Sequence, residues 1–248
     1  MMQLQTADLL AMFEKVAFLI PQNNSNPALN GLLIEASSAQ LKLTATDGHC
    51  LAQVCNQQYR LDQAQTWLLP RRAVFELKKI IEASHDNQIF IGLCDNQLVF
   101  SGSAFNFFSK LLVDAFPQYQ SIMSKAGFYK GAVKKELFVR TLRRSSCLLS
   151  GQFIATEFGF DQKQLNVMMQ NKEVGTLEET LELEDFGGKK LDIRFYAPYL
   201  LNGLQIFTDK QLNFYLNSKQ QPIIFEHNQE QMQFTYLAMP VSAINEAQ

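Results

Sequence analysis

The chain has 248 residues and a formal net charge of −2, with 47% hydrophobic, 11% aromatic and 19% charged residues. Such a composition can bury a full core, which excludes a disordered or low-complexity protein. The near-neutral charge removes bulk charge as an argument for nucleic-acid binding, so binding of that kind needs segregated charge. At this length two small domains are the better prior than one large domain.

Cysteine and histidine usage argues against a zinc site and against a disulfide framework. The four cysteines show no C-x-x-C spacing, and the three histidines lie far apart. The first twenty residues carry Asp8 and Glu14 and have no basic residue before Lys15, which is the wrong charge pattern for a signal peptide. No apolar run approaches the roughly 18 residues of a membrane span. We therefore expect a cytoplasmic protein with free thiols, without a metal or a cofactor.

In chain order, apolar periodicity predicts four helices, at 6–20, 70–83, 134–149 and 197–207. Short strands separated by polar turns are expected between them. Three strand segments open with the same Gln-Leu pair, and they cover residues 40–48, 97–105 and 164–170.

The predicted elements repeat along the chain. The helical segments 6–16 and 70–80 superpose at a shift of 64 residues. At the larger scale, matching residues recur at shifts of 124 to 127, and 124 is half the chain. The sequence therefore predicts an α+β fold of two tandem domains, residues 1–124 and 125–248. Each domain is a pseudo-repeat of a helix plus several antiparallel strands.

Charge is segregated onto the predicted helices, which together carry +5 while the rest of the chain carries −7. Arg140, Arg143 and Arg144 share one helix face by their i, i+3, i+4 spacing. The opposite, core-facing stripe is predicted to hold Leu137, Phe138, Thr141, Leu142 and Ser145. Arg71, Arg72, Lys78 and Lys79 behave similarly around Val74, Leu77 and Ile81. For any single helix the ordinary interpretation is a solvated face. The functional interpretation is a surface that follows DNA phosphates without reading bases. The first and fourth helices do not support the second interpretation.

Catalysis finds little support in the residues. His49 and Cys50 suggest a Cys/His hydrolase, but consecutive residues of an extended segment point to opposite faces, so the histidine cannot easily activate the thiol. The acidic residues between 173 and 185 have no basic or metal partner in the pattern and indicate a solvated acidic face. We expect no enzymatic activity.

Four motifs in sequence carry a family resemblance. They are TATDGHCLA (44–52), LLPRRAVFEL (68–77), FFSKLLVDAFPQY (107–119) and TYLAMPV (235–241). Together they closely resemble the beta sliding clamp subunit of bacterial DNA polymerase III, from about Met2 to Val241. Four motifs in order over some 200 residues are far more specific than any one of them.

The resemblance implies a ring of repeated clamp domains that encircles duplex DNA and tethers polymerase, with helices on the DNA-facing side. Binding would be independent of DNA sequence, because a closed ring needs only weak phosphate contacts. The DNA-facing basic residues would be Arg71, Arg72, Lys78, Lys79, Lys134, Lys135, Arg140, Arg143 and Arg144.

The family's partner pocket lies between its second and third domains, and it takes short peptide motifs from DNA polymerase, clamp loader and repair proteins. Aliphatic and methionine walls with a small polar rim suit an apolar peptide anchor. Carried over to matching positions, the pocket comprises Leu29, Thr46, Gly48, His49, Leu51, Pro117, Ile122, Tyr199, Leu237, Met239, Pro240 and Val241. Taken singly, Leu51 and Leu237 are better explained as packing residues, because buried aliphatic side chains mostly serve packing.

The chain also departs from the family. Its motifs correspond to the second and third domains, so the first domain is expected to be missing. Cys50 and Ser242 stand where basic residues are usual, and a tail at 243–248 follows. Peptide preference is therefore expected to differ, and the tail could cover the pocket.

Two functions stay open on these residues. The first is a DNA-encircling processivity clamp of bacterial replication, which three head-to-tail copies would close with six domains. The second is a truncated clamp paralogue that stays a monomer or open oligomer and competes for clamp partners as a peptide-binding module. The two differ in whether the end surfaces of the chain complement one another.

Overall fold

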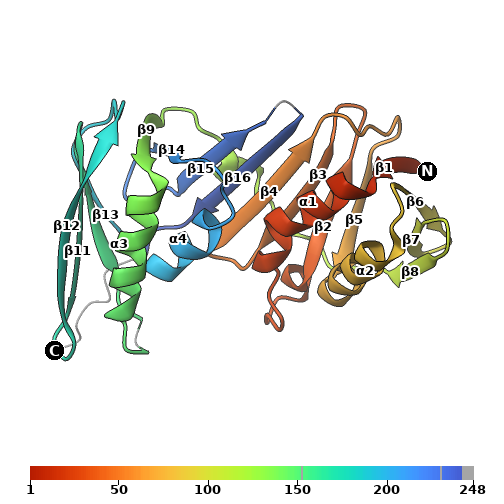
Figure 1. Ribbon diagram of the computed structural model, residues 1–248, viewed down its shortest axis with the longest axis horizontal. Coiled ribbons are helices and arrows are strands. Elements are labelled where there is room, and N and C mark those ends of the chain that lie inside the picture. The colour runs from red at the N-terminus through yellow and green to blue at the C-terminus, as the bar shows by residue number, and fades with distance from the viewer. Residues whose placement is uncertain (152, 230, 242–248) are drawn as a thin grey trace. The chain divides into compact units, whose positions relative to one another are not determined.

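The computed structural model describes residues 1–151, 153–229 and 231–241 (Figure 1). It divides into two compact units. The first holds Met1–Gln118 with Asn228–Phe234, and the second holds Tyr119–His227 and the chain from Thr235 on. In the part of the chain that is described, no helix is long and apolar enough to cross a membrane.

The first unit combines two helices with eight strands. Its elements are β1 (Met2–Gln5), α1 (Thr6–Val16), β2 (Gly31–Ala36), β3 (Leu41–Thr46), β4 (Cys50–Asn56), β5 (Gln65–Pro70), α2 (Arg71–Ser84), β6 (Gln88–Cys94), β7 (Gln97–Ser101) and β8 (Asn106–Lys110), with 3₁₀ turns at Ala17–Leu19 and Pro27–Asn30. The strands run β1-β6-β7-β8 in one antiparallel sheet and β5-β2-β3-β4 in another ladder.

The second unit repeats this plan. Its elements are a 3₁₀ turn at Gln120–Met123, β9 (Tyr129–Lys134), α3 (Lys135–Cys147), β10 (Thr156–Phe160), β11 (Gln164–Asn171), β12 (Gly175–Glu184), β13 (Leu191–Phe195), α4 (Ala197–Leu204), β14 (Gln211–Leu216) and β15 (Ile223–Asn228). The ladder runs β13-β10-β11-β12-β9-β14-β15, antiparallel where its register is defined. The strand β16 (Met232–Ala238) has residues in both units.

Helix pairs cover the sheets because each helix has one apolar stripe. Figure 1 shows α1 beside α2 in the first unit and α3 beside α4 in the second, and both pairs are in contact. The stripe of α1 is Leu9, Met12, Phe13 and Val16, all buried. Burial of such stripes removes roughly 25 cal/mol of unfavourable hydration per Å² of apolar surface.

The core of the second unit is rich in phenylalanine. Phe138 from α3 meets Phe158 from β10 edge to face, with ring centroids 6.2 Å apart, and Phe158 meets Phe195 from β13 at 5.6 Å. Such edge-to-face pairs add a little to plain area burial. These ring contacts pack α3 against β10 and β13 of the second unit's ladder.

The four predicted helices are present, and their bounds differ at the ends. The first helix ends at Val16 and continues as a 3₁₀ turn to Leu19, and the fourth ends at Leu204 rather than 207. The predicted stripe of α3 was wrong at Leu137, which is half-buried, and it omitted Val139, which is buried. Because α3 packs against α4 as well as against strands, its buried arc is wider than a single stripe.

Candidate functional site

The turn between β3 and β4 carries half of the predicted pocket, and Asp47 fixes its shape. One oxygen of Asp47, Oδ1, accepts hydrogen bonds from the backbone N–H groups of His49 (2.8 Å) and Cys50 (2.7 Å). Gly48 has φ of +97°, a left-handed conformation that favours glycine. Thr46 closes the turn, since its Oγ1 donates to the carbonyl of Cys50 at 2.6 Å and accepts from the Gly48 N–H at 3.2 Å.

A second loop lies against this turn. Leu29 belongs to the 3₁₀ turn Pro27–Asn30, whose start is capped by the side chain of Asn26 accepting from the Ala28 N–H. The Leu29 methyl Cδ1 would lie 3.8 Å from a β-carbon at Gly48. Leu29 and Leu51 are buried, whereas Gly48, His49 and Pro117 are exposed. This half therefore offers a small polar rim over an aliphatic base.

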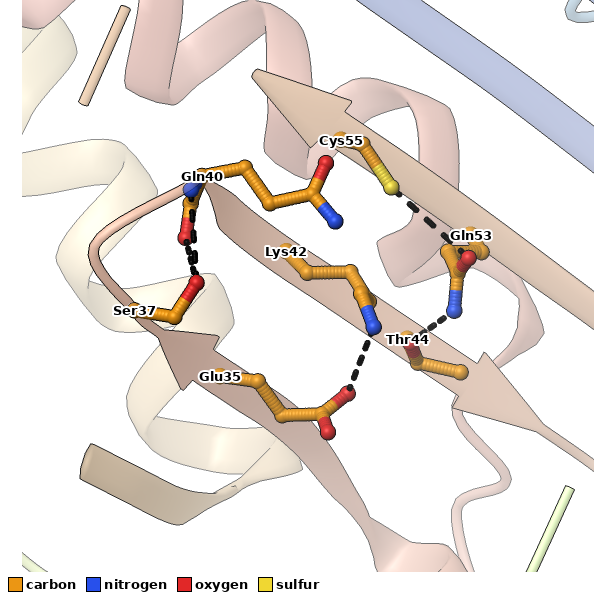
Figure 2. A network of polar contacts seen from close by, with 7 residues as sticks. All are labelled: Glu35, Ser37, Gln40, Lys42, Thr44, Gln53 and Cys55. Carbon is orange, nitrogen blue, oxygen red and sulfur yellow. Dashed lines mark hydrogen bonds and ion pairs between the residues drawn. The ribbon is translucent and has the colours of Figure 1, made fainter. Parts of the chain in front are cut away.

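Polar contacts across β2, β3 and β4 hold the ladder beneath the turn (Figure 2). Lys42 pairs with Glu35 at 3.8 Å, and the Gln53 amide donates to Thr44 Oγ1 at 2.9 Å. Next to them, the Cys55 thiol donates to the Gln53 carbonyl oxygen at 3.7 Å. Burial raises the pKa of the Cys55 thiol to about 11, so it stays protonated and unreactive at neutral pH.

Helix α4 and β16 carry the other half of the predicted pocket, and Tyr236 joins them. The Tyr236 hydroxyl donates to the backbone carbonyl of Tyr199 at 2.5 Å. Gly203 permits this approach, because a β-carbon there would lie 2.2 Å from the Tyr236 ring. The half-buried ring of Tyr199 meets Tyr196 edge to face at 5.0 Å, and Tyr196 stacks on Phe153 at 4.5 Å.

The segment after β16 lies along the outer edge of β13. The Val241 N–H donates to the Arg194 carbonyl at 2.9 Å. Leu237 is buried, while Met239, Pro240 and Val241 are half-buried, and so is Ile122 in its own 3₁₀ turn. A half-buried methionine and valine form an adaptable apolar wall.

The twelve predicted pocket residues thus fall into two groups. Leu29, Thr46, Gly48, His49, Leu51 and Pro117 lie on the first unit; Ile122, Tyr199, Leu237, Met239, Pro240 and Val241 lie on the second. Their union in one pocket stays a prediction. Ser242 and the tail 243–248 lie outside the described residues.

The predicted DNA-facing residues of α2 are mostly engaged within their unit. Arg71 donates to the Ile20 carbonyl at 3.0 Å and lies over the Phe75 ring. Lys78 pairs with Glu14 at 3.3 Å and Lys79 with Glu76 at 3.2 Å. Such exposed pairs contribute little to stability, but they neutralise charge that would otherwise face a phosphate.

Two of the predicted DNA-facing residues of α3, Lys135 and Arg144, also contact other residues of their own unit. Arg144 forms a two-pronged ion pair with Glu179 of β12, which also accepts a hydrogen bond from the Thr141 hydroxyl at 2.6 Å. The hydrogen bond from Arg144 lowers the pKa of Glu179, and the Glu179 carboxylate raises the pKa of Arg144. Lys135 donates to the Phe207 carbonyl.

Four of the nine basic residues have exposed side chains that make no ion pair or hydrogen bond to any other described residue. They are Arg72, Lys134, Arg140 and Arg143. Sequence spacing could not separate them from Arg144, because the partner Glu179 lies 35 residues further along the chain. The residues that hold the site in shape, Asp47 and Tyr236, were likewise not predicted, although the Asp-Gly pair signalled the turn.

Repeated units of paired helices and antiparallel ladders define a clamp-type architecture, and comparison with known proteins agrees. A family model for the central domain of the DNA polymerase III beta subunit matches residues 3–118, and one for its C-terminal domain matches residues 122–242. The chain belongs to the beta sliding clamp family, and it contains the counterparts of the central and C-terminal domains.

Relatives and solved structures match over nearly the whole chain. The beta sliding clamp of Pseudomonas putida is 25% identical over 241 residues, and that of Escherichia coli K12 is 25% identical over 239 residues; each match covers 96% of this chain. The chain spans 64% of the length of these relatives. The crystal structure of the Pseudomonas aeruginosa DNA polymerase sliding clamp superposes with a TM-score of 0.87 at 22% identity, covering 97% of this chain and 66% of that one. The Thermotoga maritima DNA polymerase III beta subunit gives 0.90 at 18% identity, covering 97% and 65%.

Proposed function

We propose that the protein is a DNA sliding clamp of bacterial replication, a cytoplasmic and non-catalytic accessory subunit that encircles duplex DNA and tethers polymerase. The observation that carries the proposal is the match of two consecutive clamp family models, in order, to residues 3–118 and 122–242. Fold alone does not imply function, so the proposal also needs sites for DNA and for partners.

Partner binding would use the two groups of pocket residues as one site. The rim at Gly48 and His49 is held rigid by the Asp47 turn, and the wall at Met239 and Val241 is half-buried. A preorganised rim and an adaptable apolar wall together suit a short peptide with a hydrophobic anchor. Partners would be DNA polymerase, clamp loader and repair proteins that carry such motifs.

DNA contact would rest on Arg72, Lys134, Arg140 and Arg143, the four basic residues without an internal partner among the described residues. Free guanidinium and ammonium groups can replace the counterions of DNA phosphates, which gives binding that is independent of sequence and sensitive to salt. Few such contacts imply weak affinity, and a ring that slides needs no more.

A closed ring would come from head-to-tail copies of the chain. In the described residues, β12 pairs with β11 along 175–182 but with β9 only at Leu183 and Glu184, and β8 pairs with β7 alone. Exposed edges of this length are normally paired or protected. We propose that β8 of one copy pairs with β12 of the next, so that three copies close a six-domain ring.

A second candidate is a clamp paralogue that binds partner peptides without encircling DNA. It is favoured by the internal contacts of five of the nine candidate basic residues, which fit weak DNA contact. In that case the edges of β8 and β12 would stay apart, and the chain would compete with a full-length clamp for partners.

Solution mass distinguishes the two candidates. Light scattering at increasing concentration is expected to approach three times the chain mass of 28.3 kDa. A mass that stays at one chain at every accessible concentration would leave the peptide-binding module as the better account. As a control, replacing Ser109 of β8 by proline would remove a strand N–H and should lower the trimer fraction.

A further inference from the structure

A hollow at one end of the second unit's ladder adjoins the residues predicted to bind partners. It has a volume of about 520 Å³, and it is lined from the starts of β10 and β12 and from the ends of β11 and β13. Two contacts join it to pocket residues of the same unit. The Val241 N–H donates to the carbonyl of Arg194, which lines the hollow, at 2.9 Å. The ring of Tyr199 meets Tyr196, which stacks on Phe153 of the hollow. The hollow therefore continues the second-unit half of the predicted pocket.

The ring of Phe153 has one covered face and one open face. Tyr196 stacks on it with centroids 4.5 Å apart and an interplanar angle of 25°. Phe153 is nevertheless 45% exposed, and it makes no second ring contact in the part of the chain that the structure describes. Met168, in the same hollow, is 48% exposed. An open ring face beside a thioether suits an aromatic side chain, because rings and sulfur atoms both interact favourably with aromatic rings.

The charges beside this apolar surface favour a cation in the ligand. Glu157 and Glu178 are the cross-strand neighbours of Met168 on its two sides. Glu157 is paired with Arg194, whereas the exposed Glu178 side chain makes no ion pair or hydrogen bond to another described residue. Adjacent strands lie about 4.8 Å apart, so a Lys or Arg whose alkyl stem lies on Met168 has its charge within reach of Glu178. An acidic side chain at the same place would be repelled.

We propose that the hollow is a second subsite for partner peptides, which takes an aromatic side chain on Phe153 with a basic residue beside it. The inference rests on the proposed partner binding at Tyr199, Met239 and Val241. The ring contacts that lead from Tyr199 through Tyr196 to Phe153 measure 5.0 and 4.5 Å between centroids. An extended chain advances about 3.4 Å per residue, so a side chain about three residues from an anchor on Tyr199 reaches the Phe153 ring. The hollow thus selects among partners that share the same anchor.

Fluorescence anisotropy with labelled peptides and the full chain tests the subsite. All peptides carry the same clamp-binding segment of a bacterial DNA polymerase, with Trp-Lys, Ala-Lys or Trp-Glu placed about three residues before or after its apolar anchor. On one side of the anchor, the Trp-Lys peptide should bind about fivefold more tightly than the Ala-Lys peptide, and the Trp-Glu peptide should lose most of this gain.

Variants of the chain assign the gain to the hollow. Phe153→Ala and Met168→Ala should each reduce the advantage of Trp over Ala to less than about twofold. Val174→Ala, at a position that is also 45% exposed but lies outside the hollow, is the matched control and should keep the full advantage. Glu178→Gln should remove most of the preference for Lys over Glu beside the tryptophan.

Equal binding of the Trp-Lys and Ala-Lys peptides on both sides of the anchor would overturn the subsite and leave the partner pocket in place. So would an equal loss of both peptides in Phe153→Ala with no loss of the Trp advantage in Met168→Ala, because Phe153 would then act only by supporting Tyr196 and Tyr199. A Trp advantage that fades as the protein concentration rises would mean that a second copy covers the hollow, which also overturns the subsite. A native chain that binds none of the peptides would overturn the partner pocket and the subsite with it.

Discussion

At the scale of single residues, Asp47 and Glu179 decide how the candidate sites can work. Asp47 uses one carboxylate oxygen to hold two consecutive N–H groups, and so presents Gly48 and His49 at a fixed turn. Glu179 binds the guanidinium of Arg144 and takes one basic group out of the predicted DNA surface. In both cases an acidic residue outside the predicted site determines what a predicted site residue can do: Asp47 positions His49, and Glu179 neutralises Arg144.

The pocket prediction is tested best at Met239, which is half-buried, rather than at Leu51, whose 1% exposure means that a charge there would unfold the site. Met239→Glu should weaken binding of a clamp-binding peptide by at least about tenfold, or roughly 1.4 kcal/mol, from a micromolar starting affinity. Fluorescence anisotropy of a labelled peptide measures the affinity of each variant.

Val174→Glu is the matched control, since Val174 is partly exposed in the turn before β12 and outside the proposed pocket. This variant should bind the peptide as the native chain does. Unchanged affinity in Met239→Glu, with the fold intact by circular dichroism, would show that the carried-over pocket is wrong.

The arginines of α3 are predicted to differ in their contribution to DNA binding, because Arg144 is paired with Glu179 whereas Arg140 and Arg143 are not paired with any described residue. Replacing Arg140 and Arg143 together by glutamine should reduce the slope of log affinity against log salt by about 0.9 for each lost phosphate contact, for all DNA sequences alike. Filter binding or anisotropy at several salt concentrations measures the slope.

The matched control keeps the charge of the helix face constant. Arg144→Gln combined with Glu179→Gln removes one positive and one negative charge that already neutralise each other. This pair should leave the salt slope unchanged. A larger effect from this pair than from Arg140 and Arg143 would mean that Arg144 leaves Glu179 to contact DNA.

At the scale of elements, periodicity predicted the helices well and their environments less well. The buried positions of α2 at Val74, Leu77 and Ile81 follow directly from amphipathic spacing. The burial of Val139 of α3 did not, because the neighbouring helix α4 comes from a segment about sixty residues later. Nearby sequence encodes the stripe, whereas its width depends on which element packs beside it.

The link between α3 and β12 makes a prediction about pH. Glu179 has a folded-state pKa below the ordinary glutamate value of 4.5, held there first by the hydrogen bond from Arg144. Its stabilising contribution is therefore complete well above pH 4.5 and is lost as the pH falls through the lowered folded value. Because the pair is partly solvated, the contribution should be below about 1 kcal/mol.

Thermal unfolding of the native chain and of Glu179→Gln, followed by circular dichroism, measures this contribution. The native chain should be the more stable at neutral pH, and the difference should disappear in acid. A difference that stays constant from neutral to acidic pH would contradict an electrostatic origin. Glu178→Gln on the same strand is the control for removing one carboxylate, because it leaves the Arg144–Glu179 pair in place.

At the scale of the whole molecule, the repeat of strand and helix patterns predicted two tandem α+β domains. The resemblance of four motifs predicted that these are clamp domains, and the family models confirm it. What the sequence could not provide is the contact between copies. Each edge strand, β8 or β12, is specified by its own ladder, and complementarity between two such edges depends on angles that no local pattern encodes. The same reason leaves the union of the two pocket halves as a prediction.

Topological retention on DNA tests the ring most directly. The protein is assembled with nicked circular DNA at high concentration, then crosslinked between cysteines placed at Lys110 of β8 and Glu178 of β12, with Cys94 and Cys147 replaced by serine. Gel filtration in high salt removes protein that is held only by charge. The proposed ring predicts that crosslinked protein stays with the circle and is released once a restriction enzyme cuts it. Crosslinked protein that leaves intact circles as readily as linear DNA would contradict the ring.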